Sequence, residues 1–401
     1  MQYVSARFLL IASTFLAAFS AVAVGQITLL PPKFLYSSDF TDNKILGYTV
    51  NPTTGTIKPT AQGSVPTHTG PTRVASDKGG YRLYVINQSS KDLSAYFIYR
   101  NDGSLHSVPG SPFAIGETPN GIAVAPSGKY VYVTTLKSVN SPQSWVYAFA
   151  VESNGSLKPI PGSPFSTVNW AGTLTVDPQG KYLYVSSVPL TSTPSKSEID
   201  AYSINATDGA LTPVPGSPYT EPNSPYCANG AWDIAVHPSG NFLVIPNLCA
   251  GVIVNRIERS TGTLTLVKGS PFHVNSPFDV ESIAMDPAGK YFWVSTQYCH
   301  GGCGSTNETW TINATTGVPT YLSQSNYAGC GLLQRVDPSG KFLYAIGNIQ
   351  SNGGCGYGVP PGIWGLGITR SNGSLHDISG SPWKSPNGDA QYWLNGLAVT
   401  P

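Results

Sequence analysis

The sequence predicts an all-β protein, a seven-bladed β-propeller whose blades each contain four antiparallel strands. Three observations lead to this fold class. A hairpin around a Pro-Ser-Gly-type turn recurs along the chain, a second turn with a central glycine recurs at a similar spacing, and the two chain ends supply complementary parts of one repeat.

The recurrent hairpin is clearest at Gly121–Val133, where an apolar strand, a Pro-Ser-Gly turn and a strand of alternating Tyr and Val follow one another. We interpret these as strands a and b, the inner pair of each repeat. The other copies are Thr173–Val185, Asp233–Val244, Ser282–Val294 and Leu333–Ala345, with Val74–Val85 as a version that lacks the proline.

The number of copies of the second turn gives the number of repeats. Glycine follows a polar pair at positions 55, 103, 155, 209, 262, 317 and 373, at spacings of 48 to 56 residues. Asn-Gly, Asp-Gly and Thr-Gly supply the positive φ of tight hairpins, so we expect each turn to join strands c and d. Most of these turns precede a Gly-Ser-Pro-aromatic segment, and its proline is typical of an outer edge strand: Phe113, Phe165, Tyr219, Phe272 and Trp383 are the aromatic residues.

The chain ends explain why seven c–d turns accompany only six internal a–b hairpins. Gly396–Pro401 has the pattern of a strand a, and Lys33–Tyr36 has the pattern of a strand b without its partner. We expect the C-terminal strand to complete the N-terminal blade, which closes the ring and removes its open edge.

Residues 1–25 have the features of a signal peptide, and residues 26–401 form the propeller. Arg7 precedes an apolar core, and small residues at Ala23 and Gly25 offer cleavage sites. A secreted or periplasmic location follows. The alternative is an N-terminal membrane anchor, because Phe8–Val24 is an uncharged run at the lower limit of a spanning length.

Composition restricts the partners. Only 11% of the residues are charged, the net charge is +1, and lysine and arginine are scattered along the chain. Binding to nucleic acid requires a basic surface, so we expect none, and attraction to anionic membranes is disfavoured. We expect a monomer without a membrane span in the mature chain, with a small molecule or glycan as ligand and no cofactor.

Six cysteines after a signal peptide indicate disulfides. Placed on the repeat, they predict the pairs Cys227–Cys249, Cys330–Cys355 and Cys299–Cys303, because the first two pairs join neighbouring connections at one end of a blade and the third shares a b–c loop. The alternative for Cys299-His-Gly-Gly-Cys303 is zinc, although its spacing is loose for a zinc site.

We call the end of the propeller formed by the b–c and d–a connections the top face. It carries the long insertions Lys137–Ser144, Pro189–Ser197, Gln297–Asn307 and Asn348–Gly362. Long loops on a rigid scaffold commonly carry function. The a–b and c–d turns form the opposite, bottom face and are short. There His106, His237 and His376 are expected to be solvated.

Aligned inner strands contain small residues in one column and aliphatic residues in the next, apart from Arg335 and Gln334. Departures from a repeat indicate functional or strained positions. We predict Glu281, Asp233 and Arg335 as catalytic residues at the top mouth of the channel. The predicted substrate-binding residues around them are Arg73, Asn120, Trp170, Trp232, Trp393 and Asn395. The alternative is that Arg335 pairs with an acid only to fill the channel.

The repeat, with Pro-Ser-Gly-Lys-Tyr-Val-Tyr-Val133, a Val-Tyr-Ala-Phe strand c and an Asn-Gly-Ser-Leu turn, resembles the seven-bladed lactonase-type propellers. These include 6-phosphogluconolactonase-like and carboxymuconate cyclase-like proteins and border on the YVTN surface-protein repeats. The resemblance covers Phe34–Pro401 and rests on turn and strand residues, so no catalytic motif transfers residue by residue. An extracytoplasmic location does not suit a sugar-phosphate substrate.

Two functions follow. The first is a lactone hydrolase or isomerase, in which Glu281 or Asp233 directs water while Arg335 or Arg73 holds a carboxylate or the developing oxyanion. The second is a non-catalytic extracytoplasmic propeller that binds glycans or proteins through its top loops.

Overall fold

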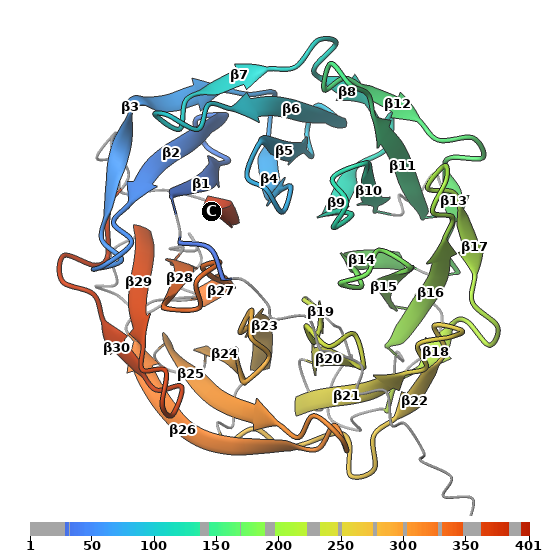
Figure 1. The fold of residues 1–401 in the computed structure, drawn as a ribbon, viewed down its shortest axis with the longest axis vertical. Coiled ribbons are helices and arrows are strands. Elements are labelled where there is room, and N and C mark those ends of the chain that lie inside the picture. Colours follow the sequence, from blue (N-terminus) through green and yellow to red (C-terminus); the bar gives the residue numbers. More distant parts are fainter. Residues whose placement is uncertain are drawn as a thin grey trace, which may run out of the picture.

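The computed structural model describes residues 29–31, 33–136, 144–168, 170–188, 197–222, 233–247, 251–275, 279–299, 303–327, 331–347, 362–384 and 394–401. Within these ranges the chain forms strands and turns without a helix, and Figure 1 shows the sheets arranged as a closed ring. No described segment forms a helix with the length and apolarity needed to cross a bilayer.

The described strands form seven antiparallel sheets, as predicted, and each is one blade running from the channel outward. Blade 1 contains β31 (Leu394–Thr400), β1 (Phe34–Asp39), β2 (Lys44–Val50) and β3 (Ile57–Pro66). Blade 2 contains β4 (Pro71–Ser76), β5 (Arg82–Asn87), β6 (Asp92–Ile98), β7 (Leu105–Ser107) and β8 (Phe113–Ala114). Blade 3 contains β9 (Pro119–Val124), β10 (Tyr130–Thr135), β11 (Trp145–Val151), β12 (Leu157–Pro159) and β13 (Phe165–Ser166).

The remaining blades follow the same order. Blade 4 contains β14 (Trp170–Val176), β15 (Tyr182–Val188), β16 (Glu198–Ile204), β17 (Leu211–Pro213) and β18 (Tyr219–Thr220). Blade 5 contains β19 (Ala235–Val236), β20 (Phe242–Asn247), β21 (Gly251–Ile257) and β22 (Leu264–Leu266). Blade 6 contains β23 (Asp279–Met285), β24 (Tyr291–Cys299), β25 (Cys303–Ile312) and β26 (Pro319–Tyr327), and blade 7 contains β27 (Gly331–Val336), β28 (Phe342–Gly347), β29 (Gly362–Ile368) and β30 (Leu375–Asp377).

Blade 1 closes the ring in the way the chain ends predict. The C-terminal strand β31 pairs antiparallel with β1, and Phe34 lies opposite Thr400 in the register. Because β31 is the inner strand of a blade that otherwise begins near the N-terminus, the first and last blades are joined through backbone hydrogen bonds.

The outer strand of most blades is interrupted at the Gly-Ser-Pro segment. In blade 4, the short strands β17 and β18 both pair with β16, and Ser217 lies between them. The Ser217 hydroxyl accepts the Ala201 N–H at 2.9 Å, so a side chain replaces the backbone partner that the strand no longer supplies. Ser111, Ser163, Ser270 and Ser381 do the same in other blades.

Neighbouring blades are joined through a buried tyrosine of strand b and a c–d turn glycine. Tyr184 is fully buried and donates its hydroxyl to the Gly262 carbonyl of the next blade at 3.1 Å. Gly262 has a φ of 78°, and a Cβ there would lie 2.3 Å from the Tyr182 ring. The recurrent glycine is therefore required both by the turn and by the close approach of the adjacent blade.

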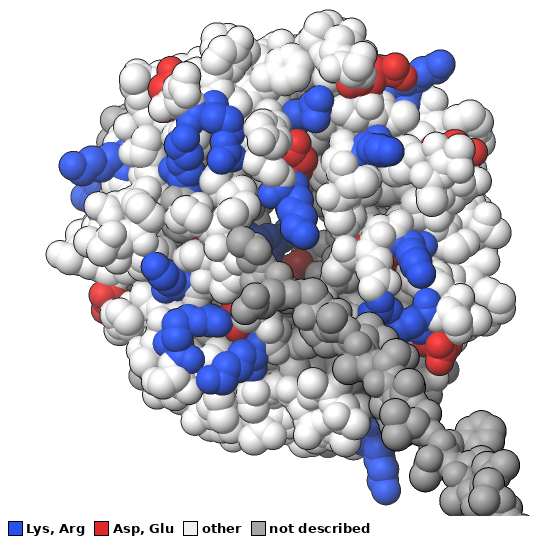
Figure 2. All heavy atoms as spheres, in the orientation of Figure 1, with Lys and Arg blue, Asp and Glu red and all other residues white. Residues whose placement is uncertain are grey.

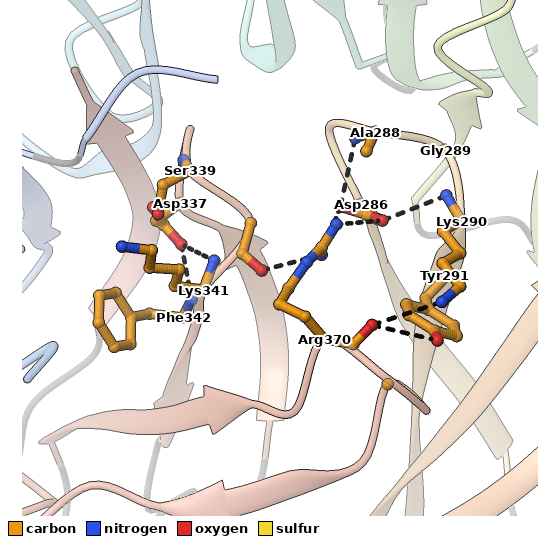
Figure 3. A network of polar contacts seen from close by, with 12 residues as sticks. Asp286, Ala288, Gly289, Lys290, Tyr291, Asp337, Ser339, Lys341, Phe342 and Arg370 are labelled. Atoms are coloured by element: carbon orange, nitrogen blue, oxygen red, sulfur yellow. Dashed lines mark hydrogen bonds and ion pairs between the residues drawn. The ribbon is translucent and has the colours of Figure 1, made fainter. Parts of the chain in front are cut away.

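The a–b turns of blades 2, 4, 6 and 7 at the bottom face are held by an aspartate at their first position. Asp337 is buried, and its carboxylate accepts the backbone N–H groups of Ser339, Lys341 and Phe342 (Figure 3). In blade 5 a histidine takes this place. His237 is only 5% exposed and donates Nε2–H to the Gly289 carbonyl of blade 6, so the expectation that it is solvated was wrong. The burial lowers its pKa.

Candidate functional site

The central channel contains a cavity of about 360 Å³ lined by inner strands of several blades. Its polar side chains are Arg73, Thr173, Thr175, Asp233 and Arg335, and the other lining residues are aliphatic, methionine or glycine. The small and aliphatic inner columns seen in the sequence thus supply most of the side chains that line the cavity. Arg73, Asp233 and Arg335 are the charged residues among them.

Arg335 and Asp233, two of the predicted catalytic residues, form an ion pair in this channel. Arg335 Nη1 lies 3.0 Å from Asp233 Oδ2, although Arg335 belongs to blade 7 and Asp233 precedes the inner strand of blade 5. The guanidinium therefore reaches past the inner strand of blade 6. The Asp233 side chain is 6% exposed, whereas that of Arg335 is 37% exposed and faces the cavity.

Two residues of blades 6 and 7 orient this pair. Ser282 on β23 donates its hydroxyl to Asp233 Oδ2 at 3.0 Å and accepts the Gln334 N–H at 3.3 Å. Gln334 on β27 donates its side-chain amide to the Trp293 carbonyl at 2.9 Å, and its own carbonyl accepts Arg335 Nη1 at 2.8 Å. The four residues form a closed polar circuit through three blades.

Arg73 on β4 of blade 2 lines the same cavity. Burial lowers the pKa of its guanidinium, while Asp233 raises it and the positive charge of Arg335 lowers it. No hydrogen bond or ion pair to Arg73 occurs within the described part of the chain. The cavity thus contains two guanidinium groups and one carboxylate, and one guanidinium has a free set of donors. Such a group recognises an anion, most effectively a planar carboxylate.

The third predicted catalytic residue, Glu281, is placed differently. It is half-buried, lies at a register shift of β23 between Val280 and Ser282, and is not among the residues that line the cavity. Similar register shifts occur at the top of β4, β9, β14, β27 and β31. A bulge redirects side chains, so these bulges turn this column of residues away from the inner wall.

Asn120 and Trp170 belong to the predicted substrate-binding set. Asn120 lies at the register shift of β9, and its amide donates to the Ala171 carbonyl of blade 4 at 3.2 Å, which is a contact between blades. Trp170 begins β14 and is 39% exposed. Neither lines the cavity. Trp232 and Trp393 lie outside the described residues, as does the side chain of Asn395 on β31.

The predicted disulfides fall mostly outside the described residues, which do not include Cys227, Cys249, Cys330 or Cys355. The strand register places Cys299 opposite Cys303 at the end of the β24–β25 hairpin, and their side chains are not described. The three pairs stay predictions. The long insertions of the top face also lie largely outside the described ranges.

Glu221, which follows β18, is one of the buried acids that sequence reasoning did not single out. It is 3% exposed and accepts the Asn255 amide of blade 5 at 3.0 Å. Burial raises the pKa of this carboxyl to about 7. Asn255 occupies the position of Tyr96 and Tyr202 in other blades, where the tyrosine hydroxyl donates to a backbone carbonyl. The replacement of this strand-c tyrosine by Asn255 was the sequence signal that could have identified the site of Glu221.

Comparison with known proteins identifies the family. The profile described as "Lactonase, 7-bladed beta-propeller" matches residues 12–118 and 195–332, more than half of the chain, and the chain therefore belongs to this family. No curated protein matches the sequence.

Solved structures share the fold. A candidate 6-phosphogluconolactonase from Bacteroides uniformis ATCC 8492 superposes with a TM-score of 0.69 at 17% identity, covering 92% of this chain and 100% of that one. A similar candidate from Bacteroides fragilis NCTC 9343 gives 0.67 at 19% identity, with 93% and 99% coverage. The periplasmic gluconolactonase PpgL of Pseudomonas aeruginosa gives 0.69 at 14% identity, with 92% and 99% coverage. At sequence identities this low, the similarity to these structures shows a shared fold.

Proposed function

We propose that this protein is an extracytoplasmic lactone hydrolase or isomerase, and that its substrate enters the central channel and carries a carboxylate. The observation that carries the proposal is the cavity-lining guanidinium of Arg73, which has no hydrogen-bond partner among the described residues and lies near the Arg335–Asp233 pair. The family membership and the resemblance to a periplasmic gluconolactonase support the reaction class and the location.

The cavity lining also limits the substrate. Apart from the charged residues, only Thr173 and Thr175 offer side-chain hydrogen bonds, and the other lining side chains are aliphatic, methionine or glycine. A phosphorylated sugar lactone carries a dianionic phosphate, whose charge exceeds the single excess positive charge of the two arginines and Asp233. A small lactone with one carboxylate matches that single charge.

In the proposed hydrolysis, water attacks the lactone carbonyl carbon and the ring C–O bond breaks, which yields a hydroxy acid. Arg73 would bind the substrate carboxylate, and Arg335 would stabilise the oxyanion that develops on the carbonyl oxygen. Asp233 would accept the proton of the attacking water through Oδ1, whose hydrogen bond among the described residues is from the Ile234 N–H at 3.1 Å. The leaving ring oxygen would then take up that proton. Ser282 would hold Asp233 in place.

A binding role without chemistry is the second candidate. Val168 and Trp170 are 63% and 39% exposed at the end of the propeller where the inner strand of blade 4 begins. An exposed aromatic and an aliphatic side chain on the loop-bearing face would suit a glycan or protein partner.

Turnover of a lactone panel distinguishes the two candidates. The panel should pair neutral lactones with carboxylated ones of equal ring size, and the variants should be Arg335→Met, Arg73→Gln and Trp170→Ala. Arg256→Gln is the control, since Arg256 is exposed on β21 and donates to the Thr315 carbonyl away from the channel. The enzyme role predicts turnover of carboxylated lactones that both channel variants lose. Absence of turnover across the panel, with glycan binding that only Trp170→Ala weakens, would favour the second candidate.

A further inference from the structure

The bottom face gathers basic side chains that the sequence spreads over the whole chain. Each a–b turn in the Gly-Lys-Tyr or Gly-Lys-Phe pattern exposes one lysine, and Figure 2 shows lysine and arginine side chains spread over one face of the ring. The exposed lysines of this pattern are Lys129, Lys181, Lys290 and Lys341, and Lys78 is exposed in the Lys-Gly-Gly-Tyr turn of blade 2. Lysines that are scattered along the chain thus come to one face, because a repeat of about fifty residues places equivalent positions on the same side of a propeller.

The aspartates of the a–b turns, which lie next to these lysines, are buried. Asp77, Asp177, Asp286 and Asp337 are all 5% exposed or less and accept backbone N–H groups within the turns. Figure 3 shows the lysine chains of Lys290 and Lys341 beside two such carboxylates. The exposed acids of this face, Asp102, Glu152, Asp208 and Glu258, lie on the outer c–d turns. An anionic surface approaching the centre of the face would meet the lysines first.

Apolar and aromatic side chains lie among these charges. Leu30 is 45% exposed and lies with Leu29 at the bottom opening of the channel, against prolines of the a–b turns. Tyr81 and Tyr99 are 59% and 53% exposed on blade 2 of the same face, and Arg100 lies 5.4 Å from the centre of the Tyr81 ring. Lysine with exposed tyrosine and leucine is typical of surfaces that rest in the headgroup region of a bilayer.

Exposed apolar side chains favour a membrane over a soluble polyanion as the partner. Leu29 and Leu30 precede β1 and lie on this face, and a soluble polyanion would leave the exposed Leu30 in water. We propose that the bottom face docks on an anionic phospholipid surface, which leaves the top face and the mouth of the channel directed away from the membrane. Lysines near such a surface each contribute to binding, and the attraction is screened by salt.

Co-sedimentation of the full chain with phosphatidylcholine vesicles, with and without phosphatidylglycerol, tests this proposal. Two variants with the same change in net charge are compared. The first replaces Lys129, Lys181, Lys290 and Lys341 with Gln, and the second replaces Lys44, Lys91, Lys268 and Lys384, which lie outside the a–b turns. We expect the first variant to bind phosphatidylglycerol vesicles at least about tenfold more weakly and the second to bind like the wild type.

Thermal unfolding of both variants checks that the fold is retained, because Lys44, unlike the other exchanged lysines, is half-buried and pairs with Asp42. Equal binding of both variants to anionic vesicles, or binding that does not depend on phosphatidylglycerol, would overturn the proposal. Heparin serves as a soluble polyanion in the same experiment. Loss of heparin binding in the first variant without loss of vesicle binding would assign the face to a soluble partner and would also overturn it.

Discussion

Two arginines of this propeller make ion pairs that look alike but sit in different surroundings. Arg370 on the bottom face pairs with Asp286 at 2.9 Å, and Arg335 in the channel pairs with Asp233 at 3.0 Å. Both guanidinium groups are a little over one-third exposed and both carboxylates are buried. Arg370 contacts both oxygens of Asp286 and also donates to the Gly340 carbonyl, whereas only Nη1 of Arg335 contacts Asp233 (Figure 3).

The difference lies in how each pair relates to the repeat. Asp286 is the regular aspartate of an a–b turn, and Arg370 joins adjacent blades at a turn, so this pair reinforces the scaffold. Arg335 departs from its column of small residues, and its contact with Asp233 passes over a whole blade beside a cavity. The Arg370–Asp286 pair therefore stabilises the scaffold, whereas the Arg335–Asp233 pair marks a candidate site.

The largest effect on stability is expected from Arg370→Met. Asp286 is fully buried, and removing its bidentate partner leaves a buried charge supported only by turn N–H groups. Breaking a buried pair in this way costs about 3–5 kcal/mol, and partial exposure of Arg370 places the expected loss near the lower end. Urea unfolding measures it, with lactone turnover as the second readout. Turnover should be unchanged, and a loss of activity without a loss of stability would reverse the assigned role.

Glu221 differs from Asp286 and Asp233, because it is a buried acid that has no cationic partner among the described residues. Its folded pKa of about 7 exceeds the ordinary glutamate value, so the folded protein holds a proton that the unfolded chain releases. Its contribution to stability is present below about pH 4.5 and is lost as the pH rises toward 7. Glu221→Gln should remove this loss, with a gain of up to about 3 kcal/mol at pH 8 and little change near pH 4.5.

Unfolding of wild type and Glu221→Gln across this pH range checks the prediction. Glu152→Gln is the matched control, because Glu152 is exposed on a c–d turn. A pH dependence that persists unchanged in Glu221→Gln would show that another group is responsible.

A smaller effect on stability is expected from Arg335→Met, about 1–2 kcal/mol, because cavity water can reach Asp233 once the arginine is gone. The second substitution Asp233→Asn should recover most of this loss, since it removes the unpaired charge. Comparison of the two single variants and the double variant in urea measures the coupling. Additive losses would mean that the two side chains do not act as a pair.

Much of the fold follows from the sequence because turn chemistry is local. The glycine turns give the number of blades, and the count of hairpins against turns gives the composite closure, which pairing of β31 with β1 confirms. Among the charged residues that line the cavity, Arg335 was singled out because it breaks an inner column, and Arg73 and Asp233 because they stand at the top entry of inner strands.

The partners within the site could not be derived in the same way. Column alignment places Glu281 nearest to Arg335, but the bulge in β23 takes Glu281 off the cavity wall, and Arg335 pairs with Asp233 instead. The sequence does not single out Ser282, because serine is common in inner strands. Its role is visible only in the structure, where its hydroxyl lies between Asp233 and Gln334. Register shifts and contacts across blades depend on three-dimensional packing that a repeat alignment does not contain.

The most direct test of the central claim is urea unfolding of Arg73→Met with and without a carboxylated lactone from the panel. If Arg73 is kept for ligand binding, it costs stability without a ligand, because it is half-buried near the positive charge of Arg335 without a bonded partner among the described residues. The account predicts that Arg73→Met is as stable as the wild type or more stable, and that the lactone no longer stabilises it. A variant that unfolds more easily and is still stabilised by the lactone would contradict the account.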